Sequence, residues 1–191
     1  MDLEHSVSPQ DVKYQFTGQA SYDLPIGRGR AVSMGGIGNA ALGGWTLNGI
    51  VYLSTGVPIA SPTSGVEPAY FNQRANMTCD PSKGALHTAD EWFKMDCFSI
   101  PSSPFVPGTA PAYLDHVRTA GARDVDLSLY KHFTFGKERD FRFEISSYNV
   151  GNYAQLGMPN VPNLTVPEDW GLIGNTVNSP RQFQFGGRFT F

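Results

Sequence analysis

Hydrophobic and polar residues alternate with a period of two in five segments of the chain. Successive side chains on a strand point to opposite faces of a sheet, so this pattern predicts five β-strands with one apolar and one polar face each. In the fourth segment, for example, Phe141 and Phe143 alternate with Arg142 and Glu144. The predicted strands cover residues about 14–24, 45–57, 124–135, 139–151 and 181–191.

The lengths of these strands and of their connections favour a membrane location. Strands of soluble proteins usually have about 5–6 residues, whereas a tilted strand that crosses a bilayer needs about 9–11. The third and fourth strands are joined by the tight turn Gly136-Lys137-Glu138, but residues 58–122 and 152–180 form long connections. Short turns that alternate with long loops are typical of outer-membrane barrels.

The chain is therefore predicted to be all-β. We expect an antiparallel, curved sheet of about five long strands that belongs to a transmembrane β-barrel, with long irregular extracellular loops. The polar face carries Gln, Ser, Thr, Asn and Tyr with few charges, as in a wall that faces a hydrated lumen. The alternative is a soluble, secreted β-sandwich that binds carbohydrate, in which the same apolar face fills a core. Alternation by itself does not separate these two folds.

Composition agrees with a strand-rich chain and limits its partners. Only 16% of the residues are charged, and the chain has 21 glycines and 14 prolines, which suits strands and turns better than helices. The net charge of −3 gives no reason to expect a nucleic-acid partner. The start of the chain lacks the apolar stretch of a signal peptide.

No group of residues resembles a catalytic or metal-binding motif. The four histidines are scattered, and none is paired with a second ligand at helical spacing. Cys79 and Cys97 have no nearby histidine pair, so a zinc site is not expected. The sequence thus predicts no enzyme activity, no cofactor and no metal.

The first long connection contains features of a small folded segment. A disulfide between Cys79 and Cys97 is expected in an oxidising compartment, and two unpaired thiols are the alternative. A short helix is expected to begin at Asp90, capped by Thr88 or by Asp90 itself. Trp92, Phe93 and Phe98 are expected to form a satellite core beside the disulfide.

Two sets of side chains are candidates for recognition. If the first loop touches a ligand, its contacts are expected to come from Tyr70, Phe71, Arg74 and Trp92, because aromatic residues and Arg dominate such surfaces; alternatively, the loop only covers the barrel mouth. On the lumen side we expect a mixed-charge set in which Asp126 lies across from Arg142 or Glu144. That set is Asp124, Asp126, Arg142, Glu144 and Arg188.

Several segments in order resemble the C-terminal barrel strands of TonB-dependent receptors, and in particular the Oar-like receptors common in Acidobacteria. The segments are YDLPIGRGR, GGWTLNGI followed by STGVP, DLSLYKHF and PRQFQFGGRF. The resemblance covers residues 14–191.

This resemblance implies a bacterial outer-membrane location and a role in TonB-dependent uptake of a ligand. It also implies that the last strand carries a signal for the barrel-assembly machinery, formed by Phe183, Phe185, Phe189 and Phe191, although Gly187 interrupts the aromatic pattern. The family's barrel has 22 strands and an N-terminal plug domain, whereas five strands are predicted here. We therefore expect partners in outer-membrane lipid, the remaining barrel strands and plug of a longer parent receptor, and TonB through the parent's N-terminal part.

Overall fold

The computed structural model describes residues 5–65, 73–136, 138–161, 163–166 and 171–191. Two compact units make up the chain. The sheet unit comprises Phe16–Leu53, Arg123–Ala154 and Asn178–Phe191, and the loop unit comprises Met1–Gln15, Ser54–Ala122 and Gln155–Val177. No helix within the described residues is long and apolar enough to cross a bilayer.

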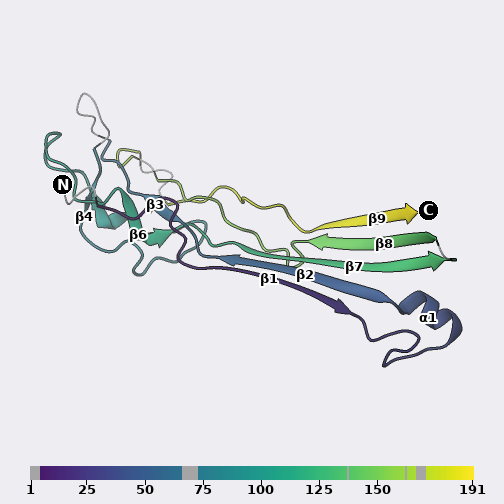
Figure 1. The fold of residues 1–191 in the computed structure, drawn as a ribbon. Helices are drawn as coiled ribbons and strands as arrows, with labels where there is room; N and C mark the ends of the chain where they lie inside the picture. Colours follow the sequence, from purple (N-terminus) through teal and green to yellow (C-terminus); the bar gives the residue numbers. More distant parts are fainter. Residues whose placement is uncertain (1–4, 66–72, 137, 162, 167–170) are drawn as a thin grey trace. The chain divides into compact units, whose positions relative to one another are not determined.

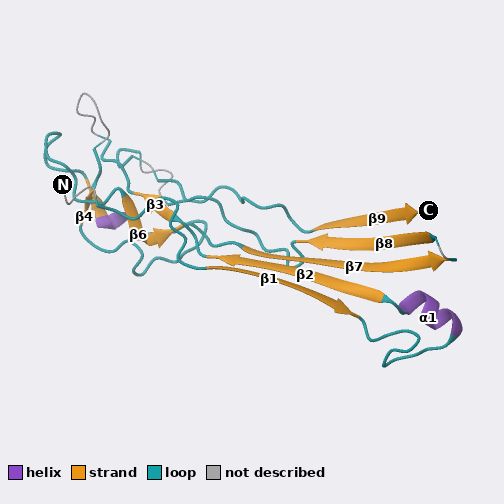
Figure 2. Ribbon diagram, viewed as in Figure 1, coloured by secondary structure: helices purple, strands orange, loops and turns teal. Residues whose placement is uncertain are grey.

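Five long strands form the sheet unit in the order β1-β2-β7-β8-β9 (Figures 1 and 2). β2 pairs antiparallel with β7, β7 with β8, and β8 with β9. This arrangement, with little helix, confirms the predicted all-β fold class. The strands are β1 Gln15–Asp23, β2 Trp45–Ser54, β7 Arg123–Phe135, β8 Arg139–Tyr148 and β9 Gln182–Thr190.

Two of these strands end earlier than the sequence pattern indicates. β2 stops at Ser54, two residues before Gly56. A Cβ added at Gly56 would lie 1.7 Å from the carbonyl oxygen of Thr119. The backbone at Gly56 thus runs too close to that of Thr119 for the alternation of side chains to continue. β8 stops at Tyr148 because Asn149 adopts a left-handed backbone conformation with φ of 48°. Between β1 and β2, the connection contains the short helix α1, Gly36–Leu42.

The apolar face of the sheet unit is uncovered. Cross-strand register places Leu47, Leu129 and Ile145 side by side on this face, with Phe185 next in line. Phe185 is 69% exposed and Phe191 is 92% exposed. A soluble β-sandwich would bury such a face between two sheets, so the alternative of a soluble carbohydrate-binding module is not favoured.

Aromatic side chains gather on this face where β7 ends and β8 begins. The rings of Phe133 and Phe141 have centroids 6.2 Å apart, and those of Trp45 and Phe143 are also 6.2 Å apart, edge to face. Gly187 lies opposite Phe143, and a Cβ added there would come within 3.2 Å of the Phe141 ring. The gap in the terminal aromatic pattern thus provides room for a neighbouring aromatic ring.

The loop unit consists mostly of irregular loops, as the sequence predicts, but it also contains short strands that the sequence pattern did not indicate. β3 (Pro58–Ala60) pairs with β6 (Tyr113–Arg118), and β4 (Asn76–Met77) pairs with β5 (Phe98–Ser99). The two long connections fold together, because Leu164 N donates to Thr63 O at 2.9 Å and Ile173 N donates to Ala89 O at 2.8 Å.

A hydrophobic core holds these short strands. It is built around Ile59, Phe93, Phe98, Leu114 and Val117, all of which are buried. Short strands offer few ladder hydrogen bonds, so the apolar contacts of this core account for most of the organisation of the unit.

The predicted satellite core is part of this cluster. Cys79 and Cys97 are joined by a disulfide, and Trp92 packs partly buried against the core. The helix expected at Asp90 is absent among the described residues. Instead, Thr88 Oγ1 accepts a hydrogen bond from Glu91 N at 3.3 Å, and only the 3-10 turn η2, Met95–Cys97, follows.

Candidate functional site

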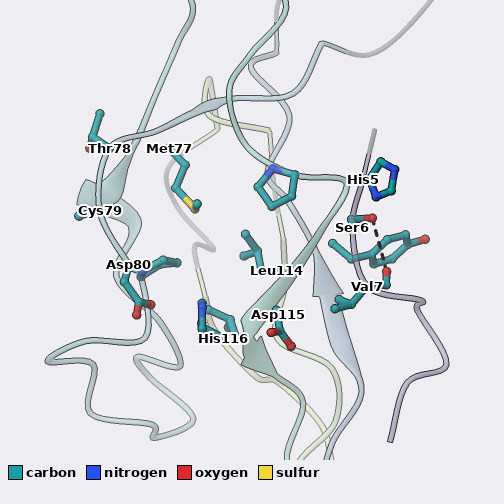
Figure 3. A pocket seen from close by; sticks show the side chains of 14 residues that line it. His5, Ser6, Val7, Met77, Thr78, Cys79, Asp80, Leu114, Asp115 and His116 are labelled. Atoms are coloured by element: carbon teal, nitrogen blue, oxygen red, sulfur yellow. Dashed lines mark hydrogen bonds between the residues drawn. The ribbon is translucent and has the colours of Figure 1, made fainter. Parts of the chain in front are cut away.

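A hollow of about 540 Å³ lies within the loop unit (Figure 3). Three stretches of chain line it: residues 5–7, residues 77–81 at the disulfide, and residues 111–117 on β6 and just before it. The β6 strand and the disulfide position the last two stretches, so their relative placement depends on the core of the unit. The volume falls in the range of small-molecule sites, about 300–1,000 Å³.

Apolar groups form the inner part of this hollow, and charged groups stand at its rim. Met77 and Leu114 contribute apolar side chains to the lining, and Asp80, Asp115 and His116 contribute polar ones. Sites that bind small molecules commonly combine an apolar lining with a few polar groups that fix orientation.

The Asp80 carboxylate is held in place by its own turn. Ser82 donates to Asp80 Oδ1 from its hydroxyl at 2.7 Å and from its backbone N–H at 3.0 Å. These hydrogen bonds, helped by the nearby His116 and Lys83, lower the pKa of Asp80 below its ordinary value of 3.8. Asp80 is therefore a fixed negative charge at neutral pH.

Asp115 is fixed by two cations. Arg118 Nη2 lies 3.0 Å from Asp115 Oδ1, and Lys13 Nζ lies 3.3 Å from the same oxygen. The hydrogen bonds from Arg118 and then Lys13 lower the pKa of Asp115. The Arg118 side chain is only 12% exposed and also contacts Asp11 Oδ2 at 2.5 Å, so it joins the N-terminal stretch to β6.

The arrangement is chemically suited to binding. Its two carboxylates and the exposed His116 imidazole can meet a polar or cationic group while an apolar part of the same ligand contacts Met77 and Leu114. Among the described residues, no three His, Cys, Asp or Glu side chains come together in a way that could hold a metal ion.

The sequence-predicted ligand contacts are not gathered at this hollow. Tyr70 and Phe71 lie outside the described residues. Arg74 Nε donates to Ala110 O at 3.0 Å, and Trp92 Nε1 donates to Arg118 O at 2.6 Å. Arg74 and Trp92 thus contribute to the internal structure of the loop unit, and the role of all four in ligand binding stays a prediction.

The charges predicted for the lumen wall share the polar face of the sheet. Arg142 forms an ion pair with Glu144 at 2.8 Å and lies 4.3 Å from the centroid of the Tyr130 ring. Arg188 is directly opposite Arg142 in the register of β8 and β9, and Asp124 is opposite Tyr52 in that of β2 and β7.

The expected cross-strand position of Asp126 is wrong. Arg142 lies opposite His132, and Glu144 lies opposite Tyr130, because the turn at Gly136 sets a register that carries Asp126 further along the sheet. Asp126 Oδ1 instead accepts a hydrogen bond from Asn149 N at 2.9 Å, where β8 ends.

Sequence reasoning missed the residues of the hollow, above all Met77, Asp80, Leu114 and His116. The register of β3 with β6 shifts between Pro58 and Ile59, and this irregularity disrupts the alternation that identifies strands. The strand Tyr113–Arg118 is short. Its apolar residues Leu114 and Val117, which are buried, were the sequence signal that could have identified it.

Comparison with known proteins supports the membrane assignment. The family model described as "Outer membrane beta barrel domain" matches residues 1–184. No curated protein and no solved structure gave a match. Together with the uncovered apolar face of the five-stranded sheet, the family match places the chain in the bacterial outer membrane. The chain belongs to the outer membrane beta barrel domain family.

Proposed function

We propose that the chain takes part in TonB-dependent uptake of a ligand across the outer membrane, as part of an Oar-like receptor, and that the hollow of the loop unit contacts the ligand. The observation that carries this proposal is the loop unit itself. Its folded core presents a hollow of about 540 Å³ with fixed carboxylates at the rim. A barrel that only lets small solutes diffuse has little need for a folded recognition unit of this kind.

The sheet supports a place in a larger barrel. Single-chain bacterial barrels have at least about eight strands, and an open sheet edge is not tolerated in hydrocarbon because its N–H and C=O groups would lack partners. β1 and β9 are the edges of the five-stranded sheet. We propose that other strands of a parent receptor pair with them and that a plug domain and TonB act in the same receptor.

The last strand supports assembly by the barrel-assembly machinery. Phe183, Phe185 and Phe189 occupy one face of β9, and Phe191 follows at its end. All four side chains are exposed in the sheet unit. They are therefore accessible to a factor that recognises an aromatic terminal strand.

Uptake by cells that express the parent receptor tests the proposal. The probes are a fluorescent ferric chelate, a labelled oligosaccharide and a labelled peptide, each offered with and without a proton ionophore that removes the energy source of TonB. We expect uptake of one probe to require the proton gradient and to fall about tenfold or more in a Leu114→Asp variant, whose new carboxylate would lie in the apolar part of the hollow.

An exposed control tests whether a new carboxylate on the loop unit affects uptake by itself. Leu86 is exposed on the loop unit and does not line the hollow, so Leu86→Asp is expected to leave uptake unchanged. Because Leu114 also belongs to the core, His116→Ala provides a second variant at an exposed position. Gradient-independent passage of every probe would contradict TonB-dependent transport, and full uptake by both hollow variants would remove the hollow from recognition.

A further inference from the structure

A second hollow, of about 430 Å³, lies in the sheet unit at the edge where β7 ends. One wall is the end of β7, residues 131–135, and the other is the connection between β1 and β2 with helix α1. Figure 1 shows α1 beside the start of β2 at this edge of the sheet. None of the residues that line it also lines the hollow of the loop unit.

The lining of this hollow is basic. Arg28, Arg30 and Lys131 contribute to it together with His132, which pairs with Asp140 at 2.7 Å, and among the described residues no Asp or Glu side chain lines it. The surrounding unit is also basic, with 9 Lys and Arg against 6 Asp and Glu, whereas the loop unit has 5 against 11. An anion entering this hollow would therefore meet a positive local field.

Lys131 has a structural role at this hollow. Its side chain is 5% exposed on the apolar face, and its Nζ donates to the carbonyl oxygens of Ala40 and Ala41 at the C-terminal end of α1. Trp45 Nε1 donates to the same Ala41 oxygen at 2.9 Å. These bonds hold the connection against the end of β7 and compensate the carbonyls that the last helical turn leaves unpaired.

The two arginines differ in their availability. Arg30 Nη2 forms an ion pair with Asp23 at 3.2 Å. Arg28 is exposed and has no hydrogen bond or ion pair with any residue that the structure describes. Guanidinium groups bind phosphate oxygens through two parallel N–H donors, so Arg28 is available to a phosphate with Arg30 beside it.

The apolar surface next to the hollow indicates that such a phosphate would belong to a lipid. The apolar face beside the hollow carries Trp45, Phe133 and Phe143, the kind of aromatic residues that line the interface between bilayer and water. Ile37 on α1 is 88% exposed and Phe135 is 56% exposed, so apolar surface continues next to the basic lining. A ligand that places a phosphate in the hollow and acyl chains on this face satisfies both features.

We propose that this hollow binds the headgroup of an anionic glycerophospholipid of the adjacent leaflet, with Arg28 as the main phosphate contact. A zwitterionic headgroup is a poorer ligand, because its ammonium group would lie beside the unpaired guanidinium of Arg28 and would find no carboxylate among the described lining residues. The short turn between β7 and β8 emerges at the same edge, which is the periplasmic side in outer-membrane barrels.

The test measures lipid binding to the full chain in detergent micelles by native mass spectrometry. The probes are phosphatidylglycerol and phosphatidylcholine with identical acyl chains. We expect a preference for phosphatidylglycerol, and about fivefold weaker phosphatidylglycerol binding in Arg28→Gln, the effect of one arginine near a lipid phosphate. Arg123→Gln is the matched control: it removes the same charge from an exposed arginine at the opposite end of β7, and binding is expected to stay within about twofold.

Several outcomes would overturn the proposal. Equal binding of the two lipids by the unmodified chain is one, and equal losses in Arg28→Gln and Arg123→Gln are another. Complete displacement by soluble glycerol phosphate would assign the site to a free phosphoryl compound instead of a lipid. If Arg28→Gln loses its strand signal in circular dichroism, Arg28→Ala is the second variant that removes the charge, and unaltered phosphatidylglycerol affinity in a folded Arg28→Ala chain would exclude Arg28 as the phosphate contact.

Discussion

The two units of this chain distribute apolar side chains in opposite ways. In the loop unit, Ile59, Phe93 and Val117 are almost completely buried around a common core. In the sheet unit, Phe183, Phe185 and Phe189 lie exposed along one strand. The loop unit folds by removing apolar surface from water, whereas the sheet unit presents apolar surface to lipid.

Buried polar residues occur in both units, but buried large apolar residues occur only in the loop unit among the described residues. Buried residues of the sheet unit include Lys131, Ser146, Ser147 and Asn149, whereas most of those in the loop unit core are apolar. Hydrophobicity along the chain therefore does not reveal which side chains are inside. The difference lies in whether a second layer covers the apolar residues, and that can be tested by substitution in one unit at a time.

The largest expected effect comes from removing one large side chain from the loop-unit core. Phe93→Ala should lower the free energy of unfolding of this unit by about 3–5 kcal/mol, because the 2% exposed ring leaves a cavity. Hydrogen exchange of the amides in β3 and β6 measures it. Phe185→Ala removes the same atoms from an exposed position and should leave these amides unchanged; an equal effect of both would break the contrast between the units.

Removing the disulfide should affect the same unit. A Cys79→Ser, Cys97→Ser double variant opens a link across 18 residues and should lower the free energy of unfolding by about 3 kcal/mol. The measurement is again hydrogen exchange, with the sheet-unit amides as the internal reference. Reductant should accelerate exchange in the unmodified chain and leave the double variant as it is. Faster exchange confined to β8 and β9 would contradict this assignment.

A charge on the apolar face tests the sheet unit. Leu129 lies between Leu47 and Ile145, and Leu129→Arg should lower the free energy of unfolding in phospholipid vesicles by about 2–4 kcal/mol if this face meets hydrocarbon. Urea titration followed by tryptophan fluorescence measures the change. Ser128→Arg places the same charge on the opposite face and should cost much less. Equal destabilisation by the two variants would mean that the faces do not differ in solvent.

The smallest effect concerns pH and the loop unit. Folding lowers the pKa of Asp115, so the stabilisation is fully present above the ordinary value of 3.8 and is lost as the pH falls through the folded value. The melting temperature of the loop unit should fall as the pH drops below about 4, and less steeply in Asp115→Asn. Asp90→Asn, at an exposed position, should retain the slope of the unmodified chain. A melting temperature that depends more steeply on pH in Asp115→Asn than in the unmodified chain would contradict this prediction.

The sheet could be predicted from the sequence because long strands repeat one simple rule. β7 alternates over 13 residues, and its apolar positions match those of β2 and β8 in register. The register of the strands was harder to predict, because a period of two does not specify which residues face each other. The position of Asp126, for example, depends on the turn at Gly136. The role of Gly187, beneath the Phe141 ring, also requires a neighbouring strand to be placed first.

The loop unit was predicted only in fragments, for a physical reason. The strands β4 and β5 have two residues each, too few for any periodicity, and the register of β3 with β6 is irregular. Its core residues come from stretches as distant as Ile59 and Leu164. The hollow depends on these long-range contacts, so its lining could not be read from local sequence, whereas the proximity of Phe93 and Phe98 to a cysteine could.

The division of the loop unit among three stretches of chain also imposes an order on its biogenesis. Cys79 and Cys97 belong to one stretch, so their bond can close before β7 has left the translocation machinery. Leu164 and Ile173, by contrast, are synthesised after β8, and they attach to Thr63 and Ala89, which were made about a hundred residues earlier. This unit therefore cannot be completed until four of the five long strands have been synthesised.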